Sequence, residues 1–287
     1  MWCVGKWPQR HRAFRNPGIA GPVAPRAAIL PAREGPWAKR VADAAELFTA
    51  RPASGAVEID GCPLPEDRRY DLEHDVWWQD DPGSGTARVG VTATLASFAG
   101  PFRSLAFRPV EGTLAAGRSV ATVESVRYVG AVRLPVEATI VERNAELVRH
   151  PRVVNDDPYG SGWVVRVRPV RPDDPARLLR EAHEIAELVR SRIRSQHVRC
   201  WPATPEVEVI EVGVECSAVL ARLNEEIVHR EGGEALLLVT DDPTSPIEMV
   251  RWSDQTGHAV LAHRTEGSLH QFLVRKEAHP VPRRPRG

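Results

Sequence analysis

The thiols are the first groups in this sequence to which a specific chemistry can be assigned. The four cysteines, Cys3, Cys62, Cys200 and Cys216, are widely spaced and form no Cys-x-x-Cys pair. This spacing is typical neither of a disulfide framework nor of a zinc ribbon, so each thiol is considered alone. Cys216 lies between a predicted strand and a predicted helix, where unpaired amides and the helix dipole stabilise a thiolate able to attack a donor persulfide. Cys62 and Cys200 lack a partner motif and are predicted to be incidental.

Lysine chemistry is confined to the two ends of the chain. Almost all basic residues are arginines, and the only lysines are Lys6, Lys39 and Lys276. An arginine-biased coding sequence explains most of this usage. Even so, no amine that could be acylated lies between Lys39 and Lys276, because a guanidinium with a pKa above about 12 is not a nucleophile.

Other catalytic and metal-binding patterns are missing from the sequence. It contains no Ser-His-Asp order, P-loop or Rossmann glycine pattern. His258 and His263 do not have metal-ligand spacing relative to Cys216 or Asp241. We therefore expect no metal site, and interpret the two histidines as solvated or hairpin residues.

Two motifs in the middle of the chain are specific enough to indicate a family. The first is Val123-Glu124-Ser125-Val126, and the second runs from Asn155 through Asp157-Pro158-Tyr159-Gly160 to Gly162-Trp163. Further matching residues are Pro65-Glu66-Asp67, Tyr70-Asp71, Glu73-His74-Asp75-Val76-Trp77, Val89-Gly90-Val91-Thr92, Gly117, Pro151 and Val154. With these residues, the tract from about Val57 to Val170 resembles the lipoate-carrying H protein of the glycine cleavage system. The resemblance implies a β barrel-sandwich hybrid of the lipoyl-domain type, with His74 and Asp75 as structural residues.

Arg127 stands where the resemblance implies a lipoyl-lysine. In that family the residue after Glu-Ser-Val is a lysine at a β-hairpin tip, and it carries lipoate in an amide bond. Arg127 cannot form this bond, so we predict that lipoate is absent and that the domain is a degenerate carrier. Glu137-Ala138 also replaces the usual Ser-Gly, which makes a positive-φ turn less available. Tyr128-Val129-Gly130 instead looks like the H-like proteins associated with sulfur metabolism.

A second resemblance covers the chain from about Glu208 to Lys276. Its features are Cys216, Gly233-Glu234 before an apolar strand, Asp242-Pro243, Trp252 and a closing hairpin. This segment looks like the TusA/SirA family of sulfur carriers, in which the cysteine holds sulfane sulfur as a persulfide. Two differences matter. The family's Cys-Pro-x-Pro is here Cys216-Ser217-Ala218-Val219, and Glu215 places a carboxylate where it opposes a thiolate. The alternative is that Cys216 is a buried residue of an inert scaffold.

Composition limits the class of partner. The chain has 287 residues, enough for two domains, and 38 basic residues balance 38 acidic ones. A neutral chain is not expected to bind nucleic acid or anionic membranes in general. No apolar run approaches the roughly 18 residues of a membrane helix, and no signal peptide is recognised. The cysteine usage favours a reducing, cytoplasmic setting.

Hydrophobic patterns place these motifs in a multidomain α+β protein. We expect a disordered tail at 1–55, with a targeting peptide as the alternative and a short helix at 37–48. The H-like domain is assigned to 56–170, with strands at 87–92, 119–123, 139–141 and 163–167. One helix beginning near Asp173 or Asp174 is predicted in a connector at 171–200, followed by a proline-rich linker at 201–205.

The C-terminal part is predicted to be a two-layer α/β sandwich at 206–277. Its order is strand 208–212, a helix from 218 that stops at Gly232-Gly233, strand 235–240, helix 244–255, and a hairpin of 258–263 with 269–274. The tail at 278–287 is predicted to be disordered.

The sequence therefore predicts a sulfur-relay protein with a non-lipoylated docking domain. Its expected partners are sulfur donor and acceptor proteins, or enzymes that recognise lipoyl carriers, and it would act as a sulfurtransferase-type carrier without independent turnover. One alternative is a non-catalytic scaffold or adaptor in lipoate, glycine cleavage or sulfur metabolism. Another is an ordinary glycine cleavage H protein, against which the chemistry of Arg127 argues.

Overall fold

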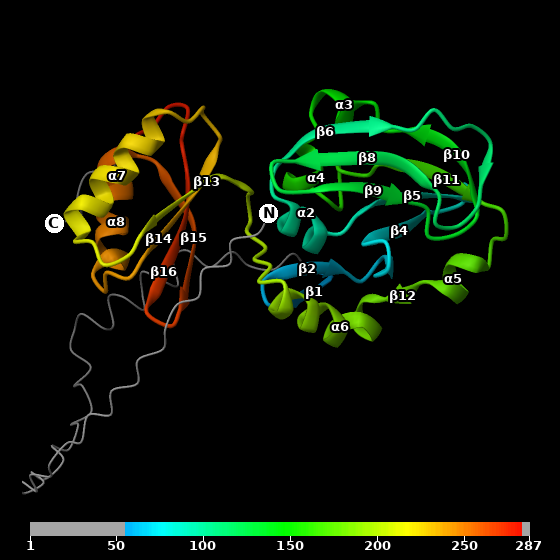
Figure 1. The fold of residues 1–287 in the computed structure, drawn as a ribbon, viewed down its shortest axis with the longest axis horizontal. Helices are drawn as coiled ribbons and strands as arrows, with labels where there is room; N and C mark the ends of the chain where they lie inside the picture. Colours follow the sequence, from blue (N-terminus) through cyan, green and yellow to red (C-terminus); the bar gives the residue numbers. More distant parts are fainter. Residues whose placement is uncertain (1–54, 283–287) are drawn as a thin grey trace, which may run out of the picture. The chain divides into compact units, whose positions relative to one another are not determined.

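The computed structural model describes residues 55–282. The predicted helix at 37–48, nearly all of the predicted N-terminal tail and the last five residues lie outside this range. The described chain contains an N-terminal β region, residues 56–200, and a C-terminal α/β region, residues 205–275 (Figure 1).

The N-terminal β region is a β-sandwich. A seven-stranded sheet of order β12-β3-β4-β5-β11-β10-β7 packs against a three-stranded sheet of order β6-β8-β9. The strands of the large sheet are β3 (Arg69–Asp71), β4 (Val76–Asp81), β5 (Thr86–Val91), β7 (Thr113–Leu114), β10 (Ala138–Arg143), β11 (Val165–Pro169) and β12 (Arg180–Glu181). Those of the small sheet are β6 (Phe102–Phe107), β8 (Ser119–Ser125) and β9 (Val129–Arg133). One buried core lies between them, because alternate apolar residues such as Val89, Val123 and Val167 point inward.

A second core lies on the other face of the large sheet. Trp77 and Tyr70 are buried there, with Tyr159 beside them. They are covered by the hairpin of β1 (Ala56–Ile59) and β2 (Cys62–Pro65) and by helix α6 (Ala182–Ser195), whose Ile185, Val189 and Ile193 face inward. The predicted connector helix is therefore part of the packing of the β region.

The single helix predicted from residue 173 is wrong in one respect, because the chain forms two helices there. Helix α5 (Asp174–Leu178) ends where Leu179 becomes extended, and Arg180 pairs with Tyr70 of β3. Helix α6 then begins with a capping box of Glu181 and Glu184. A cross-strand pairing that the helical apolar pattern does not reveal interrupts the helix.

Three further helices of the β region were not predicted. They are α2 (Ala93–Ala99), α3 (Glu146–Arg149) and α4 (Val153–Asp156). Thr92 caps α2 by accepting a hydrogen bond from the Leu95 amide at 3.2 Å. The short Ala-Thr-Leu-Ala-Ser-Phe-Ala sequence is too brief to show helical periodicity, so this cap was its main signal.

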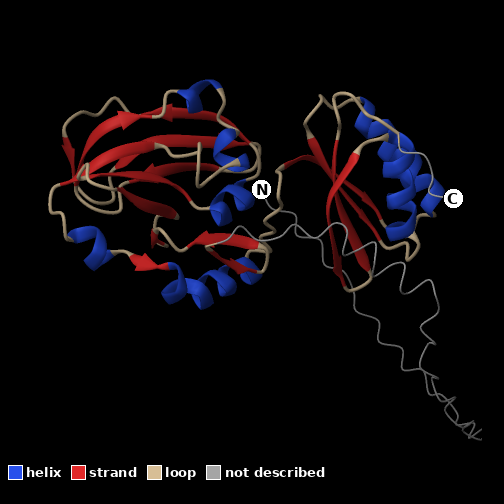
Figure 2. Cartoon of the chain, turned by 180° about the vertical axis from the view of Figure 1, so that it is seen from behind, coloured by secondary structure: helices blue, strands red, loops and turns tan. Residues whose placement is uncertain are grey.

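The C-terminal region confirms the predicted order of strands and helices. Its elements are β13 (Pro205–Glu211), α7 (Cys216–Val228), β14 (Ala235–Thr240), α8 (Ser245–Thr256), β15 (Ala259–Glu266) and β16 (Leu269–Arg275). The sheet order is β13-β14-β16-β15, with β13 and β14 parallel and the other neighbours antiparallel. Both helices cover one face (Figure 2), where Leu223, Leu238 and Phe272 are buried.

Two boundaries in this region differ from the prediction. Helix α7 ends at Val228, several residues before Gly232-Gly233, and β13 begins at Pro205, which the sequence placed in the linker. A proline is tolerated at the first position of a strand.

The prediction that Cys62 and Cys200 are incidental is wrong. The two buried residues form a disulfide between β2 and the chain that follows α6, with their Cα atoms 4.9 Å apart. The two cysteines are 138 residues apart, so their spacing in the sequence did not predict that they pair. They come together in the fold when α6 packs on the β region. The wide spacing of the cysteines was the argument for a reducing compartment. Because two of them form a disulfide, that argument no longer holds, and a cytoplasmic location remains a prediction.

No helix within residues 55–282 is long and apolar enough to cross a membrane.

Candidate functional site

The degenerate carrier position lies at the tip of the β8–β9 hairpin. Strand residue Glu124 pairs with Val129, and the Ser125 amide donates to the Tyr128 carbonyl at 2.8 Å to close the turn. The Ser125 hydroxyl accepts bonds from the amides of Arg127 and Tyr128 and donates to the Ala99 carbonyl at 2.6 Å. Ser125 therefore fixes both the shape of the tip and its position on α2.

Arg127 is exposed, yet its side chain is bound to α2. Its Nη2 donates to the Ser97 carbonyl at 3.1 Å, close to the C-terminus of the helix. Gly100 lies next to the Arg127 guanidinium. A Cβ built at Gly100 would be only 3.1 Å from Arg127 Nε, so the two residues are closely packed. A cation at this end of a helix is favoured by the unpaired carbonyls. Because the guanidinium cannot be acylated, the tip does not fit a lipoyl group.

Apolar side chains surround the tip. Val126 and Val129 are 79% and 73% exposed, and Phe98 of α2 is 40% exposed. Tyr128 packs edge-on against Phe98, with ring centroids 6.2 Å apart. We call Phe98, Val126 and Val129 the tip patch. Exposed apolar residues gathered in this way are typical of a protein-contact surface.

Two residues of the second sequence motif, Asn155 and Tyr159, hold α2 in place. Asn155 donates to the carbonyls of Ala96 and Gly100 at 2.9 and 2.8 Å and accepts from the Phe102 amide at 2.8 Å. The Tyr159 hydroxyl accepts a hydrogen bond from the Ala93 amide at 3.2 Å. Both ends of α2 are therefore held by this motif, which explains why the hairpin motif and the Asn155 motif occur together.

Other motif residues have structural contacts, as the sequence predicted. His74 Nδ1 lies 2.7 Å from Asp71 Oδ2, and Asp75 forms an ion pair with Arg192 of α6. Burial raises the pKa of Asp75, and the Arg192 charge opposes this rise. Glu137 and Ala138 do not adopt positive φ, in keeping with the loss of the Ser-Gly turn.

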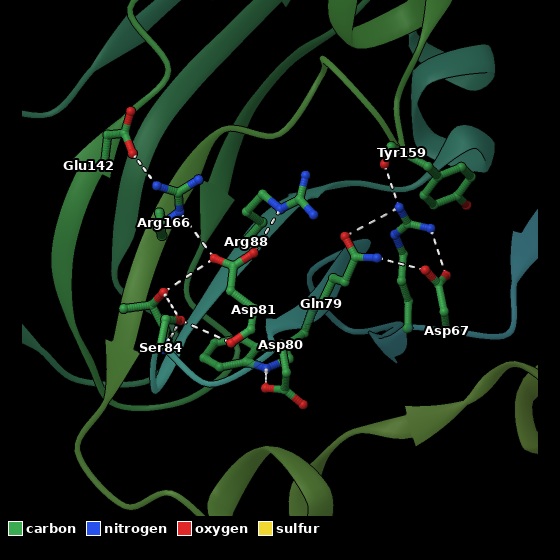
Figure 3. Close-up of polar contacts among 12 residues, drawn as sticks. Asp67, Gln79, Asp80, Asp81, Ser84, Arg88, Glu142, Tyr159 and Arg166 are labelled. Atoms are coloured by element: carbon green, nitrogen blue, oxygen red, sulfur yellow. Dashed lines mark hydrogen bonds and ion pairs between the residues drawn. The ribbon is translucent and has the colours of Figure 1, made fainter.

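The large sheet also carries a network of ion pairs (Figure 3). Arg166 bridges Asp81 at 3.1 Å and Glu142 at 2.6 Å, and Arg88 also pairs with Asp81. Arg68 contacts Asp67 and donates to the Tyr159 carbonyl. The arginines are matched by carboxylates, so this surface is a stabilised face rather than a reactive site.

Known proteins match the β region. The family described as Glycine cleavage H-protein matches residues 68–192. Glycine cleavage system H protein 5 of Aquifex aeolicus is 37% identical over 147 residues, which are 50% of this chain and 98% of that relative. The chain belongs to the glycine cleavage H-protein family.

Other members of the family cover a similar share of the chain. Probable glycine cleavage system H protein 2 of Saccharolobus solfataricus is 31% identical over 140 residues, covering 48% of this chain and 94% of the relative. The crystal structure of an H protein from Mycobacterium marinum covers 44% of this chain and 98% of its own, with 32% identity and a TM-score of 0.38. The H-protein match ends at residue 192, before the C-terminal α/β region begins.

Cys216 lies at the start of α7, which begins two residues earlier than the predicted helix at residue 218. Its thiol is half-buried, and it is free, unlike the cysteines of the disulfide. Burial raises the pKa of the Cys216 thiol, a hydrogen bond with Thr244 lowers it, and the carboxylates of Asp242 and Glu248 raise it further. The pKa therefore lies above its ordinary value. The opposing charges come from Asp242 and Glu248 rather than from Glu215, which the sequence singled out.

The surroundings of Cys216 were not found from the sequence. Thr244 donates its amide and hydroxyl to Asp242 Oδ1, both at 2.7 Å. Burial alone would raise the pKa of Asp242, but these bonds outweigh it and the pKa falls below its usual value. Strands β13 and β14 end here, and β14 residue Thr240 pairs with His270. The parallel pairing of β13 with β14 brings these residues together at the carboxyl ends of the two strands. In open α/β sheets, ligands bind at such carboxyl ends.

The histidines considered as metal ligands do not come together. His263 stacks on Phe272 at 4.4 Å and lies 3.2 Å from His270, and burial lowers the pKa of His263 to about 4. His258 instead packs beside Trp252 and accepts a bond from the Glu277 amide. Among residues 55–282 no group of three His, Cys, Asp or Glu could hold a metal ion.

Proposed function

We propose that the protein is a sulfur-relay adaptor. Its H-like β region docks partner proteins without carrying lipoate, and its C-terminal α/β region, a TusA-like domain, carries sulfur on Cys216. The observation that carries the proposal is the place of Cys216, a free thiol opening α7 at the carboxyl ends of β13 and β14. The absence of lipoate, the identity of the partners and the sulfur chemistry are all parts of this proposal.

The docking role is supported by the hairpin tip. The turn keeps its shape through Ser125, whereas Arg127 lies on the Ser97 carbonyl instead of presenting an amine. Partner proteins that recognise the hairpin of H proteins would bind the tip patch directly, and no mobile lipoyl group would be involved. A fixed apolar surface costs less conformational entropy on binding than a mobile one.

The carrier role follows from thiolate chemistry. The Cys216 thiolate attacks the outer sulfur of a donor persulfide, R–S–SH, so that a new S–S bond forms and the donor's S–S bond breaks. The products are Cys216 persulfide and the donor thiolate R–S⁻. Because burial raises the pKa of the thiol, and Asp242 and Glu248 raise it further, only a small fraction is thiolate at neutral pH. Loading is therefore expected to accelerate as the pH rises.

Mass spectrometry tests this function directly. The full chain is incubated with a cysteine desulfurase and cysteine, or with a rhodanese and thiosulfate, and its intact mass is compared before and after dithiothreitol. We expect one added sulfur atom that the reductant removes. Cys216→Ser should abolish the gain, while Cys3→Ser, which removes another cysteine, should preserve it. No sulfur uptake with either donor, or equal uptake by Cys216→Ser, would refute the carrier role.

A non-catalytic scaffold is the second candidate function. It is favoured by the two carboxylates that oppose the thiolate and by the absence of the Cys-Pro-x-Pro prolines. In that case the protein would still bind partners through the tip patch, and Val126→Asp would weaken binding while Cys216→Ser would not.

A further inference from the structure

A small cavity lies at the end of the three-stranded sheet opposite the hairpin tip. It has a volume of about 440 Å³ and is lined by three arginines, Arg108, Arg118 and Arg133, together with Pro109, Val110 and Ser119. Pockets of a few hundred Å³ are the usual size for small-molecule sites. The cavity lies wholly within the β region and has no part in the function proposed above.

Strand pairing brings the three arginines together. Ser119 at the start of β8 pairs with Arg133 at the end of β9. The Arg108 amide, just after β6, donates to the Val120 carbonyl at 2.8 Å, and the Leu134 amide donates to the Arg118 carbonyl at 3.0 Å. Segments from all three strands therefore converge, although Arg108 and Arg133 are far apart in the sequence.

The backbone and one of the arginines are held in place without a ligand. Arg133 Nη1 donates to the Gly117 carbonyl at 2.8 Å. The Arg143 guanidinium donates to the Val110 carbonyl and holds the loop that forms one wall of the cavity. Sites with fixed rims bind ligands at a smaller entropic cost.

The charges in the cavity are unbalanced. Within residues 55–282, no carboxylate lies within 4.0 Å of the guanidinium nitrogens of Arg108, Arg118 or Arg133, and Glu111, the acid closest in the sequence, pairs with none of them. On the large sheet, Arg88 and Arg166 each have such a partner (Figure 3). Arg68, which precedes β3, also has one. The three arginine side chains are exposed, and together they create a positive potential at the cavity that favours an anion there.

We propose that this cavity binds a phosphate-bearing small molecule. Arginine guanidinium groups match phosphate oxygens with paired, charge-assisted hydrogen bonds. Three of them favour a group with more than one negative charge, such as a diphosphate. Pro109 and Val110 add an apolar wall on which the non-phosphate part of the ligand packs.

Isothermal titration of the full chain at constant ionic strength tests the site. The probes are pyrophosphate, ADP and succinate, which separate a bare diphosphate, a nucleotide and a plain dicarboxylate. We expect saturable binding of pyrophosphate or ADP, and succinate at least tenfold weaker. ADP binding tighter than pyrophosphate would identify the nucleotide as the source of the phosphate.

Matched variants locate the binding. Arg118→Gln should weaken binding at least tenfold, since it removes one of the three guanidinium groups that line the cavity. Arg103→Gln removes a charge that is also exposed, from β6 outside the cavity, and should change affinity less than twofold. No saturable binding, succinate as tight as the phosphates, or an equal loss in the two variants would overturn the proposal. Thermal melts of both variants confirm that they are folded.

Discussion

At the scale of single residues, Arg127 stands at the predicted lipoyl position, and its exposed side chain is bound to α2. The sequence sufficed to predict that Arg127 could not be acylated, because that conclusion depends only on side-chain chemistry. It could not predict the contact with the Ser97 carbonyl, since α2 was not recognised. What the structure adds is the hydrogen bond that Arg127 donates near the C-terminus of α2.

We predict that the protein expressed with a lipoate ligase gains no lipoyl mass. Arg127→Lys should gain it, because Ser125 still shapes the turn and the new amine is exposed. Arg133→Lys places a lysine on β9 away from the tip and should remain unmodified. Intact-mass spectrometry measures all three proteins. Lipoate on the unaltered chain anywhere between residues 57 and 170 would contradict the prediction.

The reactivity of Cys216 is also decided by single residues. Its alkylation rate with iodoacetamide should rise with pH to a midpoint above the ordinary thiol pKa, because burial, Asp242 and Glu248 all disfavour the thiolate. Asp242→Asn removes one opposing charge, so the midpoint should move to lower pH. Glu215→Gln is the matched control and should leave it nearly unchanged. A larger shift for Glu215→Gln than for Asp242→Asn would mean that Glu215, and not Asp242, is the carboxylate that opposes the thiolate.

At the scale of elements, local patterns succeeded where one segment sufficed. Alternation identified β5, β8 and β10, a β-branched run identified β11, and the apolar run at Ala235–Thr240 identified β14. Interactions between distant segments were not predictable in this way. Pairing of Arg180 with Tyr70 split a helix, and packing of α6 joined Cys62 to Cys200. The Cys216 site needed the same kind of information, since Asp242, Thr244 and Glu248 approach it only in the folded region.

The disulfide should stabilise the β region by joining the segment that follows α6 to the β1–β2 hairpin. Closing a loop of this length restricts the unfolded chain, and its loss typically costs about 2–5 kcal/mol. We expect dithiothreitol to lower the denaturant midpoint of the wild-type protein but not that of the double variant Cys62→Ser, Cys200→Ser. Cys216→Ser should respond to the reductant like the wild type. An identical midpoint with and without reductant in the wild type would show that the bond contributes nothing.

At the scale of the whole molecule, two regions have separate cores. The β region encloses the cluster around Val89 and Val123 and a second one around Trp77, while the C-terminal region is built around Leu223, Leu238 and Phe272. A region with its own core is able to fold alone. Under the proposed function, one chain would carry both a docking surface and a thiol at a fixed stoichiometry. Such an arrangement raises the local concentration of the thiol near a docked partner.

Limited proteolysis should separate the two regions at residues 201–204. This segment has no regular structure and contains the exposed Pro202, while β13 begins at Pro205, so cleavage is expected just before that strand. The loop at Pro109 is also exposed but is held by the Arg143 bond to Val110, and should be cut more slowly. Mass spectrometry of the early fragments after treatment with a broad-specificity protease measures the order of cleavage. Fragments 55–200 and 205–287 should each melt cooperatively. If the C-terminal fragment fails to fold, its core depends on residues before 205 and the predicted domain boundary is misplaced.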